Sequence, residues 1–250
     1  MNSATTDNLI MKTQSHRPTL GKSYKFSPSE EQLAAVIQRV SEYVWHEMPD
    51  DGGWDYGTNL HYLQELCHHW IHEFNWWDHQ AKLDQFSHYR AEINDIETHY
   101  IFEKGSGSNP TPLLISHGWP GSICEFLNII EPLSHPERFG GSVDDAFDVI
   151  APSLPGFGFS GRPPRPMGPR GMANHLDKLM TNHLGYKSYI AQGGDWGAAI
   201  SSWLGFDHSH HCKALHINFL TMRHARGPQT IEERTWAEKL DQDQQIEDGY

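Results

Sequence analysis

The sequence predicts an α/β domain with a mostly parallel sheet, preceded by a helical segment. Three observations support this. Apolar residues recur at helical spacing between residues 23 and 86. From residue 87 to residue 220 the period changes to two, and short apolar strands alternate with helical stretches. One strand, at residues 189–193, runs through Gly193, Asp195 and Gly197 into a helix.

Composition sets limits on the class of protein. The chain has 250 residues, of which 37% are hydrophobic and 12% aromatic, as expected of a folded domain. Its 19 Lys and Arg against 32 Asp and Glu give a net charge of -13, which argues against nucleic acids and anionic membrane surfaces as partners. Residues 1–22 are polar and read as a disordered tail without a signal peptide or membrane anchor. The three cysteines form no CxxC pair, which favours a reducing cytoplasm.

The segment 23–86 is predicted to be a helical layer that wraps the following domain. Ser27 is expected to cap a first helix, with Pro28 in its first turn and an apolar stripe through Leu33 and Val40. A second helix is expected from about Asn59, and the aromatic run 74–77 is expected to close it. Such stripes are more often core than binding surface.

Strands and helices alternate in the following segment, 87–220. A hairpin is expected from Tyr89 to Phe102, turning at Asn94 and Asp95. Strands are then expected at 113–116, 147–152, 189–193 and 214–219, and helices at 126–133, at 173–184 and after Trp196.

The stretch around Asp195 has the pattern of a nucleophile elbow with Asp as the nucleophile. The elbow glycines Gly193 and Gly197 suit it because a sharp strand-to-helix turn leaves no room for side chains. On this pentapeptide alone, an Asp that only caps the next helix fits equally well. If Asp195 is a nucleophile, it indicates attack on a carbon that bears a leaving group, since the resulting ester, unlike an ether, can be hydrolysed.

Two backbone N–H groups are expected to form an oxyanion hole. In an elbow enzyme one donor belongs to the residue after the nucleophile, here Trp196, and the other to a loop after an early strand. The loop His117-Gly118-Trp119-Pro120 follows such a strand and offers Trp119. An ordinary Gly-Pro turn is the alternative, but the pairing with the elbow makes it the weaker one.

The 18 histidines do not predict a metal site. The groups 67–72 and 208–212 lack the H-E-x-x-H pattern and a second ligand set at zinc-like spacing. We therefore expect ordinary surface or half-buried histidines, with no metal and no cofactor.

Several motifs, in this order, resemble the microsomal-type epoxide hydrolases, which are α/β-hydrolases with an N-terminal helical segment. The similar stretches are 54–57, 60–63, 117–126, 152–160 and 192–197. The resemblance implies an α/β-hydrolase fold in which Asp195 opens an epoxide and the N–H groups of Trp119 and Trp196 form the oxyanion hole. It also places a cap-domain Tyr, which protonates the ring oxygen, at Tyr250.

The sequence pattern and the resemblance together predict the domain limits, and the resemblance implies a departure from the family. The predicted divisions are a tail (1–22), the helical segment (23–86), the first part of the core (87–220) and the start of a cap domain (221–250). The family's second cap Tyr, its water-activating His and the acid partner of that His are expected after residue 250. The sequence is therefore read as a fragment, truncated at the start of the cap.

The predicted function is hydrolysis of a small apolar epoxide to a vicinal diol through an ester on Asp195. Water is the second substrate. The fragment is expected to be inactive or to turn over once. A haloalkane dehalogenase with the same nucleophile and a non-catalytic binding module are the alternatives, and a homo-oligomer is left open.

Overall fold

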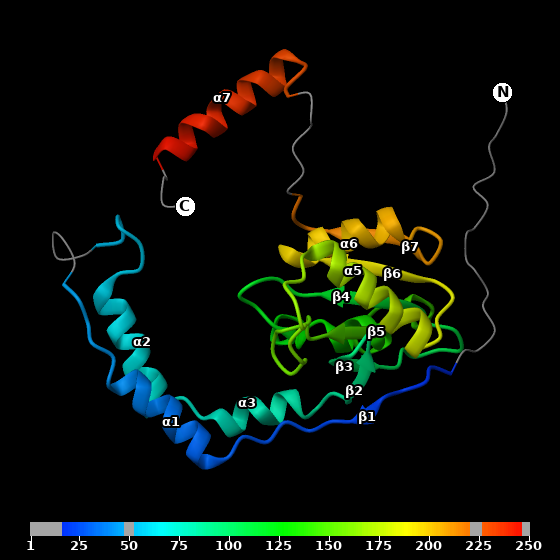
Figure 1. Ribbon diagram of the computed structural model, residues 1–250, viewed down its shortest axis with the longest axis horizontal. Helices are drawn as coiled ribbons and strands as arrows, with labels where there is room; N and C mark the ends of the chain where they lie inside the picture. Colours follow the sequence, from blue (N-terminus) through cyan, green and yellow to red (C-terminus); the bar gives the residue numbers. More distant parts are fainter. Residues whose placement is uncertain (1–16, 48–52, 221–226, 247–250) are drawn as a thin grey trace.

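A seven-stranded mixed sheet with helices on both faces forms the body of the protein (Figure 1). The computed structural model describes residues 17–47, 53–220 and 227–246. The strand order is β1-β2-β3-β5-β4-β6-β7. The strands are β1 (Lys22–Ser23), β2 (His88–Ile93), β3 (Ile96–Glu103), β4 (Thr111–Ser116), β5 (Phe147–Pro152), β6 (Tyr189–Gly193) and β7 (Cys212–Ile217).

The two halves of the sheet differ in strand direction. Neighbours from β1 to β5 pair antiparallel, whereas β5, β4, β6 and β7 pair parallel. The expectation of a mostly parallel sheet is therefore correct only for the half that carries Asp195. The predicted hairpin is confirmed: Asn94 and Asp95 join β2 to β3 with φ values of 47° and 61°, as two-residue hairpin turns require.

Two hydrophobic clusters lie on opposite faces of the sheet, because alternate residues of each strand point to opposite sides. Leu114 of β4 joins the cluster beneath α5 (Pro169–Lys178) and α6 (Trp196–Asp207). Its neighbours Leu113 and Ile115 join the other cluster, with Leu83 from α3 (Trp76–Leu83) and Ile130 from α4 (Ile130–Ser134). Every strand from β3 to β6 is thus covered on both sides.

The single helix expected through residues 126–133 is two elements, the 3-10 helix η2 (Ile123–Phe126) and α4. Pro132 explains the break. In a continuous helix its ring would clash with the carbonyl of Asn128. A new helix that starts at Ile130 places Pro132 in the first turn, where proline is tolerated.

Of the two predicted N-terminal helices, the first begins at another cap than expected and the second begins where predicted. Ser29, not Ser27, caps α1 (Glu30–Ser41), in a capping box with Gln32. Asn59 caps α2 (Leu60–His72), close to the predicted start. The aromatic run 74–77 does not close α2: Asn75 caps a third helix, α3, which the sequence analysis missed.

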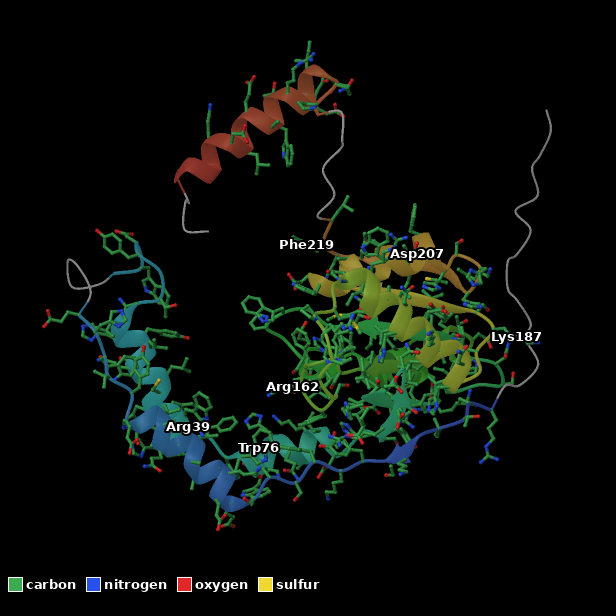
Figure 2. All side chains as sticks on the ribbon, in the orientation of Figure 1. Arg39, Trp76, Arg162, Lys187, Asp207 and Phe219 are labelled. Atoms are coloured by element: carbon green, nitrogen blue, oxygen red, sulfur yellow. The ribbon has the colours of Figure 1, made fainter. Side chains whose placement is uncertain are left out.

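The helical segment does not wrap the sheet as expected. No residue of α1 or α2 is buried, and Trp54 and Trp70 are 61% and 42% exposed. Figure 2 shows the side chains around Arg39 standing clear of the densely packed sheet, whereas α3 lies closer to it. The apolar stripes are real, but within the described residues only α3 buries part of its face, through Gln80 and Leu83.

The chain is ordered before residue 23, so the expected tail boundary is too late. Lys22 pairs with Arg90 in β1, and the Gly21 N–H donates to the Tyr100 hydroxyl at 2.9 Å. The remaining elements are η3 (Pro136–Phe139), η4 (Val143–Asp145), the π-helical turn η5 (Leu179–His183) and α7 (Ile231–Ile246). Among the described helices none is both long and apolar enough to cross a membrane.

Candidate active site

Asp195 occupies the sharp turn between β6 and α6. Its backbone has φ 48° and ψ -123°, an unusual conformation for a residue with a side chain. Such strain persists only where the surroundings hold it, and it is found most often at functional sites. The turn lies at the carboxyl ends of the parallel strands β4 and β6, where α/β sheets bind ligands.

Two glycines make this turn sterically possible. A Cβ on Gly193 would lie 2.1 Å from the backbone carbon and oxygen of Gly197. A Cβ on Gly197 would lie 1.9 Å from the carbonyl oxygen of Ser116, at the end of β4. The first turn of α6 therefore packs directly against the backbone of two strands, and this close approach sets the position of Asp195.

The loop after β4 contacts the Asp195 carboxylate. The backbone N–H of Trp119 donates a hydrogen bond to Asp195 Oδ1 at 2.8 Å. Gly118 permits this approach, because a Cβ there would lie 2.6 Å from Asp195 Oδ1. A capping box follows in the same loop: Ser122 Oγ accepts from the Cys124 N–H, and Glu125 accepts from the Ser122 N–H. The carboxylate is exposed, with one oxygen already held by a backbone donor.

Trp196 is the first residue of α6. Its N–H belongs to the first helical turn, where donors have no partner inside the helix and the helix dipole favours negative charge. The oxyanion role of Trp196 remains a prediction, and so does that of Trp119 beyond its contact with Asp195.

The side chain of His117 has a structural role that was not predicted from the sequence. It is completely buried, and burial lowers its pKa. Its Nδ1–H donates to the Gly118 carbonyl at 2.9 Å, and its Nε2 accepts from the Leu154 N–H at 3.1 Å. The imidazole is thus neutral and joins the Trp119 loop to the segment after β5. The sequence feature that could have indicated this role is a histidine placed between a predicted strand and a glycine.

Among the residues that the structure describes, no histidine hydrogen-bonds or ion-pairs with the Asp195 carboxylate. His175 is buried against Thr98, and burial lowers its pKa to about 4. His183 contacts the Tyr100 hydroxyl, and His216 is exposed on β7. Tyr250 lies outside the described residues.

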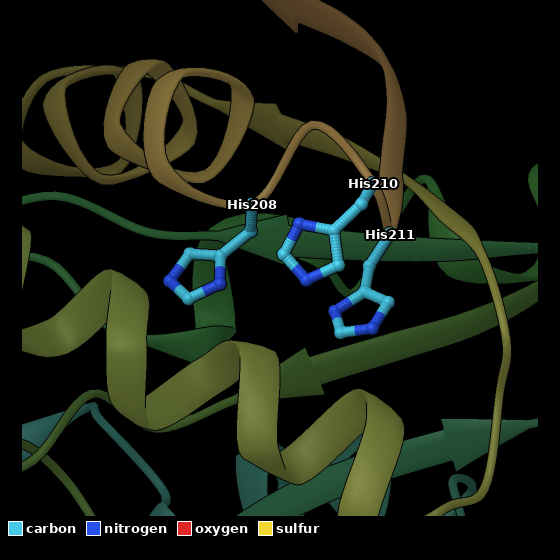
Figure 3. Close-up of side chains that lie close together, drawn as sticks. All are labelled: His208, His210 and His211. Atoms are coloured by element: carbon cyan, nitrogen blue, oxygen red, sulfur yellow. The ribbon is translucent and has the colours of Figure 1, made fainter.

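Histidines do gather elsewhere, at the turn between α6 and β7. His208, His210 and His211 each place a ring nitrogen within 4.8 Å of the others (Figure 3). The first histidine group forms no such trio among the described residues, although the rings of His68 and His72 lie 4.3 Å apart. The sequence spacing alone did not predict the second cluster, because it depends on the turn geometry.

Known proteins match this chain over most of its length. The family described as "Epoxide hydrolase N terminus" matches residues 21–126, and "alpha/beta hydrolase fold" matches residues 111–231. The chain corresponds to the N-terminal part of the epoxide hydrolases. Epoxide hydrolase 1 of Oryctolagus cuniculus is 34% identical over 202 residues, which are 79% of this chain and 44% of that protein.

Solved epoxide hydrolases share the fold. The Aspergillus niger epoxide hydrolase superposes with a TM-score of 0.79 at 29% identity, over 91% of this chain and 60% of that one. The juvenile hormone epoxide hydrolase of Bombyx mori gives a TM-score of 0.75 at 29% identity, over 90% and 51%. The chain thus spans less than half the length of the rabbit epoxide hydrolase and half to three fifths of these two structures.

Proposed function

We propose that this chain carries the nucleophilic site of an epoxide hydrolase, with Asp195 as the nucleophile. The observation that supports this most directly is the hydrogen bond from the Trp119 N–H to Asp195 Oδ1 at a strained strand-to-helix turn. The similarity to epoxide hydrolases agrees with it. The substrate class proposed is a small apolar epoxide, with water as the second reactant and no cofactor. The three cysteines are free, in keeping with a reducing cytoplasm.

The hydrogen bond gives the two carboxylate oxygens different roles. Trp119 holds Oδ1, so Oδ2 is the oxygen that attacks the epoxide carbon. The C–O bond of the ring breaks as the new ester bond forms, and the alkoxide takes up a proton from an acid. Tyr250 is our proposed acid on the strength of the family resemblance, since a phenol is a far stronger acid than an alcohol.

Oδ1 then becomes the carbonyl oxygen of the ester. When water attacks the carbonyl carbon, negative charge develops on Oδ1, where the Trp119 N–H already lies within hydrogen-bond distance. The Trp196 N–H is proposed as the second donor. Collapse of the tetrahedral intermediate releases the diol and restores the Asp195 carboxylate.

This second half-reaction needs a base to deprotonate water. Because no described histidine hydrogen-bonds or ion-pairs with Asp195, we propose that the 250-residue chain alone forms the ester and hydrolyses it very slowly. The proposal is specific about which step is slow. It predicts a stable covalent adduct rather than steady production of diol.

The test is intact-protein mass spectrometry after incubation with styrene oxide. The expected result is a mass increase of one epoxide, mapped by peptide digestion to Asp195 and absent in Asp195→Asn, which keeps the shape but cannot form the ester. Asp144→Asn, at an exposed carboxylate remote in sequence from the elbow, is the matched control and should label like the parent. An adduct that survives in Asp195→Asn, or a folded protein that gives neither adduct nor diol, would refute the proposed nucleophile.

A further inference from the structure

We infer that the turn between α6 and β7 is a binding site for a divalent transition-metal ion such as Zn²⁺, built from His208, His210 and His211. The three side chains come from one turn and converge (Figure 3). One nitrogen of each ring lies within 4.8 Å of the other two. Imidazole nitrogen is a preferred ligand of zinc, copper and nickel ions.

The backbone of the turn is fixed by hydrogen bonds. The carbonyl of His208 accepts from the N–H groups of both His211 and Cys212, each at 2.8 Å. His208 is also the C-terminal cap of α6, a helix of 12 residues. The carboxyl end of a helix carries partial negative charge, which favours a cation.

Neighbouring side chains orient two of the three rings. Asn174 Oδ1 lies 2.7 Å from His208 Nε2, and Asp177 Oδ1 lies 3.0 Å from His211 Nδ1. The contact at His211 leaves Nε2 for a metal. At His208, Asn174 engages Nε2 and Nδ1 faces Asp177 Oδ2 at 3.3 Å, so an ion bound at Nδ1 would lie beside that carboxylate. Metal-ligating histidines commonly donate their second N–H to a carboxylate or carbonyl oxygen, and these contacts match that arrangement.

Asp177 also brings a negative charge to the edge of the site. Its side chain is 7% exposed, and Oδ2 lies 3.3 Å from His208 Nδ1. The Tyr189 hydroxyl donates to Oδ1 at 2.8 Å, which ties the carboxylate to β6. The carboxylate is placed to offset the charge of a bound cation.

The site needs a modest inward movement of its ligand nitrogens. Zn–N bonds of about 2.0–2.1 Å place ligand nitrogens roughly 3.3 Å apart in a tetrahedral site. The rings must therefore approach by at most about 1.5 Å from the 4.8 Å limit. His210 is exposed, and within the described residues its imidazole makes no hydrogen bond, so it can swing inward.

The site is separate from the proposed nucleophile. Asp195 precedes the first residue of α6 and the histidines follow its last residue, so the two sites lie at opposite ends of a 12-residue helix. A bound ion would join α5, through Asp177 and Asn174, to the end of α6 and the start of β7. Its role is therefore structural, and its binding can be measured without reference to epoxide chemistry.

The test measures Zn²⁺ and Co²⁺ binding to the untagged, chelator-treated 250-residue chain. The parent for the test is His68→Ala/His72→Ala, because a pair of histidines four residues apart on α2 can itself hold a metal ion. Calorimetry at pH 7.5 should give one Zn²⁺ per chain, and Co²⁺ should give visible absorption bands of a nitrogen-ligated ion. Zinc at about 100 times its Kd should raise Tm by about 5–10 °C.

Added to this parent, His210→Ala should weaken Zn²⁺ binding at least tenfold, whereas His216→Ala, at an exposed histidine on β7, should leave it unchanged. Circular dichroism checks folding, and His210→Asn replaces the alanine variant if the latter is unfolded. Two results would overturn the proposal. One is that the His68→Ala/His72→Ala parent binds no Zn²⁺ at a Zn²⁺ concentration of about 100 μM. The other is that the His210→Ala and His216→Ala variants bind Zn²⁺ with equal affinity.

Discussion

Gly197→Ala should both destabilise the protein and displace Asp195. The new Cβ would lie 1.9 Å from the Ser116 carbonyl oxygen, about 1.1 Å short of the 3.0 Å below which real Cβ contacts essentially never fall. The obstacle is the backbone of β4, which no side-chain rotation can relieve. The first turn of α6 must therefore move away from β4 by about 1 Å.

The size of both effects follows from that displacement. Overpacking in a well-packed core costs about 1–3 kcal/mol, and we expect about 3 kcal/mol here because the clash is with backbone. A misplacement of about 1 Å at a reacting group can reduce its rate roughly 100-fold. The Trp119 hydrogen bond, 2.8 Å long in the parent, would lengthen with the same movement.

Urea unfolding monitored by circular dichroism measures the first effect, and the rate of adduct formation with styrene oxide measures the second. Gly168→Ala is the matched control: no atom lies within 4 Å of its added Cβ and its φ is not positive, so it should leave the labelling rate unchanged, and, because Gly168 caps α5, it should cost about 1 kcal/mol at most. The reasoning is refuted if Gly197→Ala unfolds within 0.5 kcal/mol of the parent, a range typical of surface substitutions.

Two further predictions concern acid stability and the loop that holds Asp195. Burial lowers the pKa of His99 to about 3, so below pH 6.5 the unfolded chain binds a proton at this residue that the folded protein does not, and His99 alone should lower the free energy of unfolding by about 1 kcal/mol per pH unit between pH 6 and 4. Urea midpoints across this range measure the slope, which His99→Asn should reduce; an unchanged slope would contradict the assignment. Ser122→Ala and Ser29→Ala each remove a helix cap worth about 1 kcal/mol. Only Ser122→Ala should slow labelling of Asp195, and equal labelling rates in the two variants would show that the cap does not position the loop.

Local sequence patterns predicted the parts of the fold that are determined locally. The β2–β3 hairpin follows from a period of two and from Asn94-Asp95, whose residue types tolerate positive φ. The elbow was predicted from Gly193 and Gly197 around Asp195 together with the loop 117–120, because the pentapeptide alone fitted a helix cap equally well. The strand Phe147–Pro152 was predicted at its observed limits.

Features that depend on competition between neighbouring residues were predicted less well. Ser27 and Ser29 both precede a helix with Pro28 between them, and only the capping box with Gln32 selects Ser29. The run 74–77 contains both the end of one aromatic stripe and an Asn that caps a new helix. A stripe shows that a face is apolar but does not show what covers it, which is why the apolar faces of α1 and α2 were expected to be buried.

Long-range contacts at the sites could not be read from the sequence. The Trp119 contact to Asp195 joins residues 76 apart and was expected only because an elbow needs a donor loop. The meeting of His211 with Asp177 joins residues 34 apart on different elements, without a spacing rule to suggest it. The histidines were therefore judged by their local pattern, which carries no information about the carboxylate behind them.

Because the backbone at Asp195 is strained, stability and catalysis favour different residues at this position. A positive φ at a residue with a side chain costs about 1–3 kcal/mol, and glycine avoids most of this cost. Replacing Asp195 with glycine should make the fold more stable while removing the proposed nucleophile. If Asp195 acts as proposed, a library of variants selected only for resistance to heat or protease would be enriched in glycine at this position. Only a selection that also requires covalent capture of an epoxide would retain the aspartate.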